Sequence, residues 1–259
     1  MIAKSALTEH IAALRLVDNH VHGYWLSAGE RSRFENGLNE ANTDPLAAFD
    51  SGFDTPLGFA VRAHCAPLLG LPAHAEPQRY WDRRCEHSGP GVGAVFLAGA
   101  GVGDWLVDCG LPGDVAGLTE MSAASGGCAH EIVRLEQVAE QAAASPGDYA
   151  SAFRAILHDR AQTAVATKSV LAYRGGFDGD LSEPSAAAVA DAAARWRDDG
   201  GSRLTDRILL RFGLHEGLRL GKPLQLHVGL GDRDCDLHRT NPMLLLDFLR
   251  QSGDTPIVL

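Results

Sequence analysis

Basic side chains are scarce in this sequence, and it contains no long hydrophobic run. The 259 residues include 23 Lys and Arg against 33 Asp and Glu, which gives a net charge of -10. Such a chain repels phosphate backbones and anionic lipid surfaces, so we expect neither nucleic acid nor a membrane as its partner. The densest basic stretch, residues 195–211, is itself interrupted by three aspartates. Charges also interrupt every candidate membrane span, and no signal-peptide pattern is visible.

Paired-cysteine motifs and two common catalytic motifs are missing as well. The five cysteines are odd in number, widely spaced and without a C-x-x-C pair, which argues against a disulfide framework or a zinc ribbon. We therefore expect reduced thiols in a cytoplasmic protein. There is no G-x-x-x-x-G-K-[ST] and no G-x-S-x-G. The glycines of residues 99–103 precede an expected strand instead of following one, so they do not predict a dinucleotide site.

What the sequence does contain is an alternation of short apolar strands with helical patterns, after a first strand at residues 16–22. This alternation predicts an α/β fold with a parallel sheet. Residues 30–100 are rich in Gly, Pro, Asn and Asp and predict a helical insertion with long loops. A helix capped by Asp148 and helices opened by Ser182-Glu183-Pro184 and Asn241-Pro242 are expected further on. The remaining expected strands are residues 104–109, 132–135, 163–172, 224–229 and 255–259.

The sharpest local pattern is Asp18-Asn19-His20-Val21-His22 at the end of the first strand. Side chains at i and i+2 of a strand point to the same face, so the two imidazoles can bind one metal ion. Asp18, on the same face, is a candidate to fix the tautomer of a ligating histidine. The same spacing also fits a pair of surface histidines on an edge strand.

Three further residues are candidates for a site at strand ends. His227 comes near the end of an apolar strand, where it is either a ligand or a core histidine. Lys168 lies inside an apolar strand, where a lysine is costly to bury. Three explanations stay open: the lysine is carbamylated and bridges two metals, its side chain extends to the strand end, or it pairs with Glu136 on a neighbouring strand. Arg174 follows that strand and either binds a substrate carboxylate or anchors a loop.

Together these segments resemble the amidohydrolase superfamily, metal-dependent hydrolases built on a TIM barrel. The resemblance rests on VDNHVH (residues 17–22), ATKSVLAYRGG (166–176) and PLQLHVGLGD (223–232). Together with GLGDRDCDLHRTNP (229–242), the sequences of the last two segments are most similar to the amidohydrolase-2 group. Within it, the similarity is to the branch also found fused to glutamine synthetase-like domains in nodulin and fungal developmental proteins. The resemblance implies one TIM-barrel-like (β/α) domain over residues 1–259, with the insertion inside it.

The resemblance also implies a ligand set. His20, His22 and His227 would bind a divalent metal, zinc first and manganese second, and Lys168 matches the carbamylated bridge of binuclear members. The family adds a histidine on its sixth strand and an aspartate on its eighth. The sixth expected strand, TPIVL, ends before any histidine. About six strands do not close an eight-stranded barrel. We therefore expect an incomplete barrel from a longer reading frame and assign no catalytic residue.

The function that follows is a metal-dependent hydrolase cleaving a C–N bond, of amide type, in a small substrate. Arg174 is the candidate for substrate binding. Two alternatives stay open: a metal-dependent non-oxidative decarboxylase, and an inactive truncated barrel, so whether this chain is itself an enzyme is left undecided. Exposed strand edges predict self-association into a homo-oligomer.

Overall fold

The computed structural model describes residues 5–39, 46–47, 50–87, 89–111, 113–233 and 235–259. The chain divides into two compact units, each described below by itself. Unit 1 comprises Met1–Glu35, Ser51–Val107 and Leu111–His130. Unit 2 comprises Asn36–Asp50, Asp108–Gly110 and Glu131–Leu259.

Six strands form one sheet, and their order in the sheet is their order in the sequence. The pairs β1–β2, β3–β4, β4–β5 and β5–β6 are parallel. A doubly wound sheet reverses its strand order at a switch point, whereas a (β/α) barrel adds each strand beside the previous one. The predicted TIM-barrel-like α/β fold with about six strands is therefore confirmed. The strands are β1 (Leu16–Val21), β2 (Val102–Asp108), β3 (Cys128–Arg134), β4 (Ala166–Ser169), β5 (Leu224–Leu226) and β6 (Ile257–Val258).

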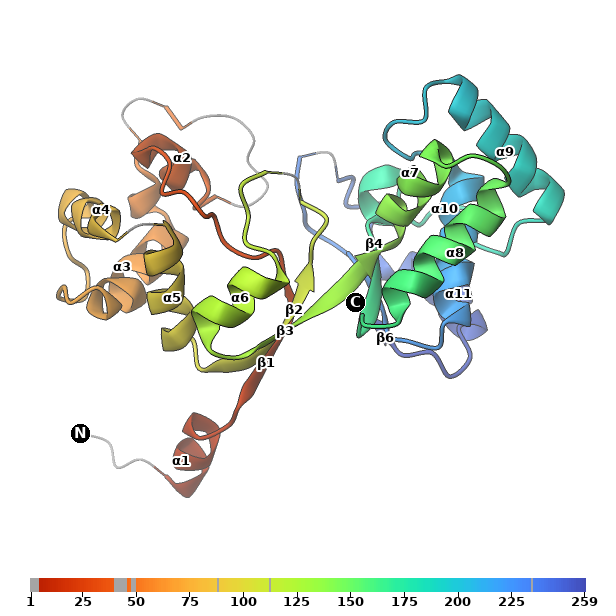
Figure 1. The fold of residues 1–259 in the computed structure, drawn as a ribbon. Helices are drawn as coiled ribbons and strands as arrows, with labels where there is room; N and C mark the ends of the chain where they lie inside the picture. The colour runs from red at the N-terminus through yellow and green to blue at the C-terminus, as the bar shows by residue number, and fades with distance from the viewer. Residues whose placement is uncertain (1–4, 40–45, 48–49, 88, 112, 234) are drawn as a thin grey trace. The chain divides into compact units, whose positions relative to one another are not determined.

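Helices connect the strands, and those between β1 and β2 are the predicted helical insertion (Figure 1). The insertion holds α2 (Arg31–Asn36), η1 (Gly52–Asp54), α3 (Pro56–Leu68), α4 (Pro77–Glu86) and α5 (Gly89–Gly99), after the N-terminal α1 (Ala6–Ala12). The later helices are α6 (Leu118–Ser125), α7 (Leu135–Ala144), α8 (Tyr149–Ala161), η2 (Leu171–Arg174), α9 (Ala186–Asp198), α10 (Arg207–Arg219), η3 (Pro242–Leu245) and α11 (Leu246–Gln251).

Unit 1 has two small apolar clusters. Trp105 and Val107 of β2 pack with Met121 of α6 under the sheet. In the insertion, the rings of Phe34 and Phe53 lie 5.7 Å apart and both contact Tyr80. Aromatic pairs at such distances stabilise a fold by more than the burial of their apolar surface alone. A few rings can therefore hold the short helices of the insertion together.

Unit 2 has one large core, in which α7, α8, α9 and α10 pack against one another (Figure 1). Helix α7 also contacts the buried strand β4, and Leu224 and Leu226 of the buried strand β5 belong to the core. Asp148 caps α8 as predicted, since its Oδ2 accepts the backbone N–H of Ser151 at 2.7 Å. The cap starts α8 where Tyr149 and Phe153 face the core, and both rings pack against Phe212 of α10.

The strand predicted over residues 163–172 is shorter than expected. It covers Ala166–Ser169, after which the chain turns into the 3-10 helix η2. The Ser169 hydroxyl accepts the N–H of Leu171 at 3.1 Å, and a Glu136 carboxylate oxygen accepts the N–H of Val170 at 3.0 Å. These side chains satisfy backbone groups that a longer strand would pair with its neighbours, and so they end the strand.

The helix expected to open at Ser182-Glu183-Pro184 begins later, at Ala186. Ser185 is its N-cap and accepts the N–H of Ala188 at 3.2 Å. Asn241 caps the last helical segment as predicted, with Pro242 in its first turn. That segment is a 3-10 turn before it continues as α11.

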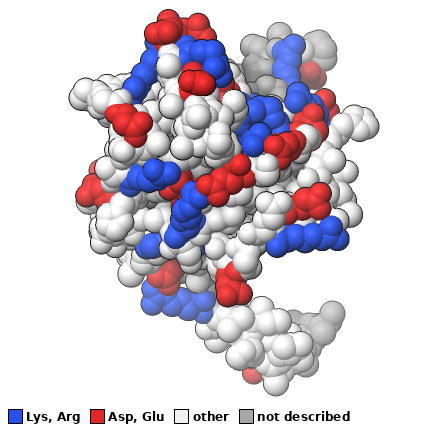
Figure 2. Space-filling view, turned by 90° about the vertical axis from the view of Figure 1, so that its right-hand side faces the viewer, with Lys and Arg blue, Asp and Glu red and all other residues white. Residues whose placement is uncertain are grey.

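Two surface properties bear on partners. Among the described helices, none has both the length and the apolarity that crossing a bilayer requires. On the face seen in Figure 2, Lys and Arg side chains alternate with Asp and Glu. In unit 2, Arg211 pairs with Asp180 and Arg239 pairs with Asp178.

Candidate metal centre

The two histidines of the first strand lie together, as their spacing predicts. His20 is in β1 and His22 directly follows its last residue. Their ring centroids are 4.9 Å apart and their planes are nearly perpendicular, at 88°. Both side chains are half-buried. The short distance between the rings lets them share one ion, and their partial exposure lets that ion exchange with solvent.

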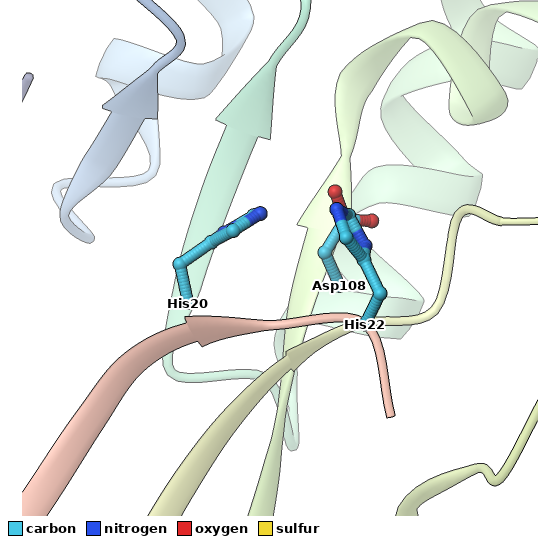
Figure 3. Close-up of side chains that lie close together, drawn as sticks. All are labelled: His20, His22 and Asp108. Carbon is cyan, nitrogen blue, oxygen red and sulfur yellow. The ribbon is translucent and has the colours of Figure 1, made fainter. Parts of the chain in front are cut away.

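Asp108 completes a group of three potential ligands. One ligand atom from each of His20, His22 and Asp108 lies within 4.8 Å of the other two (Figure 3). Asp108 ends β2, and the residue before it, Val107, pairs with Val21 of β1. The pairing of the two strands therefore sets Asp108 beside the histidines. All three groups stand where parallel strands end, the edge at which α/β barrels place their chemistry.

Asp108 was not among the ligands predicted from the sequence. The signal was present, because the second strand was expected over residues 104–109 and Asp108 is the acidic residue near its carboxyl end. An acidic residue at the end of one strand, next to a histidine pair ending another, is a pattern that could have identified it.

Asp108 is fully buried and fixed in position. Its Oδ2 accepts two hydrogen bonds from Arg134, from Nε at 3.1 Å and from Nη2 at 2.7 Å. Its Oδ1 accepts the N–H of Gly110 at 2.9 Å. A Cβ at Gly110 would lie 2.4 Å from the Arg134 Nε, so this ion pair requires glycine there. A carboxylate has about four lone-pair sites, so such a group can accept hydrogen bonds and bind a metal at the same time.

Asp18 contacts the backbone of the strand at the ligand position. Its Oδ1 accepts the backbone N–H of His20 at 3.1 Å. This bond fixes the backbone of the strand at the ligand position. The tautomer-fixing role that the sequence suggested for Asp18 stays a prediction.

Lys168 lies on β4 in unit 2 and is buried, with 7% of its surface exposed. Burial lowers the pKa of Lys168, and the nearby Arg134 guanidinium lowers it further. The carboxylates of Asp108 and Glu136 act in the opposite direction, but the pKa stays below its ordinary value. A lowered pKa increases the fraction of neutral amine, which is the form that reacts with carbon dioxide to give a carbamate. Glu136 belongs to the first turn of α7, so the expected placement on a neighbouring strand is wrong.

Glu136 is a fully buried acid beside β4. Burial raises its pKa, and the hydrogen bonds it accepts from Ser169 and Val170 only partly offset that effect. The Ser169 hydroxyl donates to its Oε1 at 2.6 Å. Its Oε2 has no hydrogen-bond partner among the described residues. Burial of such a group is costly in the ionised form, which is why the neutral acid is favoured.

His227 directly follows β5, also in unit 2, and packs against Tyr173. The two ring centroids lie 4.5 Å apart, and the Tyr173 hydroxyl is 3.0 Å from Nε2 of His227. A Cβ at Gly231 would lie 2.6 Å from that nitrogen and 2.4 Å from the tyrosine oxygen. Glycine thus lets the loop after β5 approach the imidazole closely. Burial raises the pKa of Tyr173, so the hydroxyl keeps its proton and can donate to a neutral imidazole.

Arg174, the predicted substrate-binding residue, ends η2. Its side chain is 12% exposed, with Nη2 at 3.6 Å from the Glu140 carboxylate and Nη1 at 3.4 Å from the Leu204 carbonyl. Its Nε is buried without a hydrogen-bond partner among the described residues. These contacts are those of a residue that anchors a loop, and the role in substrate binding stays a prediction.

Comparison with known proteins gives two structural matches. No family model matches the sequence, and no curated protein matches it. A protein from Lactobacillus casei ATCC 334, provisionally described as a metal-dependent hydrolase, aligns with a TM-score of 0.67 and 24% identity, over 96% of this chain and 67% of its own. Uronate isomerase (TM0064) from Thermotoga maritima aligns with a TM-score of 0.54 and 12% identity, over 95% of this chain and 70% of its own. At these identities the likeness is one of fold, and this chain shares that of a metal-dependent hydrolase candidate and an isomerase.

Proposed function

We propose that this chain is a metal-dependent hydrolase, related to the amidohydrolase-2 group, that cleaves a C–N bond of amide type in a small molecule. The observation that carries the proposal is the group formed by His20, His22 and Asp108 at the ends of two paired strands. The fold match to a metal-dependent hydrolase candidate supports it. We further propose a cytoplasmic location, a small-molecule substrate, and no nucleic-acid or membrane partner.

The donor set fits a divalent first-row ion. Two imidazoles and one carboxylate form a common three-ligand set for zinc in hydrolases and leave further positions open, and manganese accepts the same donors. Such an ion, when bound, polarises a carbonyl and lowers the pKa of water to near neutrality. Zinc is our first choice for this site.

The protein itself contributes by fixing the positions of the three metal-binding side chains before an ion binds. The pairing of Val21 with Val107 fixes the backbone next to the three donors, and Asp18 adds a hydrogen bond to the peptide of His20. Arg134 holds the Asp108 carboxylate in position through its two hydrogen bonds. Groups that orient a ligand in this way commonly change metal affinity or activity by about 10- to 100-fold when removed.

The first test is metal content together with turnover. The double variant His20→Ala/His22→Ala is expected to lose both the bound metal and metal-dependent release of amine from small amides. The matched control is His64→Ala/His158→Ala, which removes two exposed histidines and should keep both. A folded double variant with unchanged metal content would contradict the proposal. Release of carbon dioxide without ammonia or amine would support the decarboxylase alternative instead.

His227 and Lys168 are the further ligands implied by the family resemblance. Metal content of His227→Ala and Lys168→Met tests each assignment separately. A carbamate on Lys168 would appear as a ¹³C resonance after incubation with labelled bicarbonate, and Lys168→Met would lose that resonance. Loss of one metal equivalent in either variant assigns a ligand; unchanged content limits the centre to His20, His22 and Asp108.

A further inference from the structure

A second group of potential ligands lies in unit 1, at the other end of β2. It consists of Asp104 on β2 and of Cys128 and His130 on β3, with one ligand atom of each within 4.8 Å of the others. Asp104 precedes Asp108 by four residues, which is roughly 13 Å along a strand. The group is therefore separate from the histidine pair of β1.

The geometry of the group follows from the strands. Cys128 and His130 are two residues apart on β3, so their side chains share a face. His130 Nε2 lies 3.2 Å from Oδ1 of Asp104 on the adjacent strand. Cys128 is exposed, and the side chains of His130 and Asp104 are 37% and 29% exposed. All three can therefore be reached by an ion from solvent.

The backbone beneath the group is held in place. A Cβ at Gly127 would lie 2.5 Å from the carbonyl oxygen of Gly103, so glycine is what allows the chain before β3 to approach the start of β2. Ser125 accepts the N–H of Gly127 at 3.0 Å, and Ser122 of α6 accepts that of Ala129 at 3.0 Å. These bonds fix the segment that carries Cys128.

The chemistry of the group matches zinc. A thiolate, an imidazole and a carboxylate are its three common protein ligands, and three of them leave one position open. With ligand distances of about 2.0–2.3 Å, the donors of a tetrahedral site lie roughly 3.5 Å apart. Rotation of partly exposed side chains can close the remaining gap.

Arg15 is the competing cation. Its Nη2 lies 3.1 Å from Oδ2 of Asp104 and donates to the carbonyl of Gly103 at 2.9 Å. It contacts the carboxylate oxygen that His130 does not, and its side chain is 65% exposed. It can therefore share Asp104 with an ion or move away from it.

We propose that Asp104, Cys128 and His130 form a second, open zinc site that links β2 to β3 at their amino ends. Binding requires the thiol to lose its proton and the imidazole to be neutral, so one proton is released as the sulfur–metal bond forms. Because an ion that binds only the folded chain stabilises it, zinc is expected to raise the melting temperature through this site.

The experiment uses Co²⁺ as the probe, since a cobalt–thiolate bond gives a near-ultraviolet charge-transfer band that nitrogen and oxygen ligands do not. The reduced chain should develop this band as Co²⁺ is added, and Zn²⁺ should remove it. Cys128→Ser should abolish the band, and Asp104→Asn or His130→Ala should weaken cobalt binding tenfold or more. A band that survives Cys128→Ser would overturn the proposal.

Two controls separate this site from the proposed function. His20→Ala/His22→Ala should keep the band even if it abolishes turnover, because the first site contains no thiol. Cys109→Ser, which changes the exposed cysteine next to Asp108, should also keep it. Loss of the band in either control would assign the thiolate signal elsewhere and overturn the proposal. Circular dichroism checks that each variant is folded.

Discussion

Strands β1 and β4 both carry side chains that the sequence predicts as metal ligands, but the two strands hold these side chains in opposite surroundings. On β1, His20 is half-buried, and Leu16 and Val17 before it are 46% and 59% exposed. On β4 all four residues are buried, Lys168 included. An ionisable group in the first setting keeps its solvation, whereas a group in the second depends on its neighbours for compensation.

This difference separates binding from stability. The imidazoles of β1 can be changed with little effect on packing, so substitutions there should act on metal binding. The charges around β4 form a buried network that includes Arg134, Asp108, Lys168 and Glu136. A substitution in that network should first cost free energy of unfolding.

The largest expected effect is that of Arg134→Met. It leaves the carboxylate of Asp108 buried without its bidentate partner, and breaking one side of a buried ion pair typically costs about 3–5 kcal/mol. Urea unfolding measures the loss. Arg250→Met is the control, because its pair with Asp247 is exposed on both sides and its removal should change stability by less than about 1 kcal/mol. Equal losses in both variants would contradict the contrast between buried and exposed charge.

A smaller loss is expected for Ser169→Ala on β4. The hydroxyl donates to Glu136 at 2.6 Å in a buried site, and removing one partner of such a bond costs about 1–3 kcal/mol. Ser145→Ala removes an exposed hydrogen bond to the carbonyl of Gln141 and serves as the comparison. Thermal unfolding of the two variants should rank them in that order; the reverse ranking would show that Glu136 finds other donors.

Glu136→Gln should change how stability depends on pH. Burial raises the pKa of this carboxyl above its unfolded value, so between the two values the folded chain binds more protons than the unfolded one. Stability of the parent chain therefore falls as pH rises through that window, by about 1.4 kcal/mol for each unit between the pKa values. The glutamine cannot ionise, so the variant should gain stability relative to the parent as pH rises.

Unfolding curves of both proteins from acid to neutral pH test this prediction. The other charges near Glu136, Arg174 and Lys168, are present in both proteins, so their titration largely cancels in the difference. A constant difference across the range would mean that Glu136 has the same pKa in the folded and unfolded chains, which would contradict the prediction.

The sequence predicted the parts that depend on local pattern. Alternating strands and helices predicted the α/β class with a parallel sheet, and the family resemblance added the barrel-like strand order. The i, i+2 spacing placed His20 beside His22. Caps at Asp148 and Asn241 were predicted because their side chains bond within their own turn. Such features need no knowledge of distant residues.

Contacts between distant segments were not predictable in this way. Asp108 meets the histidine pair through strand register, and Arg134 meets Asp108 across 26 residues of chain. Glu136 ends the fourth strand early by accepting the N–H of Val170, 34 residues away. No local sequence pattern near residue 170 indicates that bond, which is why the strand predicted over residues 163–172 is too long.

The smallest effect on stability, and the last test of the contrast, is expected at the exposed side of β1. Among the described strands β1 pairs only with β2, so one side of it is an edge, and Val17 lies there 59% exposed. Edge strands with exposed apolar side chains tend to pair between molecules, and a lysine on the edge opposes this. Val17→Lys should therefore lower self-association while changing the free energy of unfolding by less than about 0.5 kcal/mol.

Sedimentation of the two proteins over a range of concentrations measures the association. Leu230→Lys is the matched control, because Leu230 is 72% exposed but lies outside the strands. If Leu230→Lys lowered association as much as Val17→Lys, exposed apolar surface in general would drive the association, and the edge of β1 would have no special part in it. If neither variant changed it, the open side of β1 would not be the contact, and solvent exposure there would serve only to keep His20 and His22 accessible.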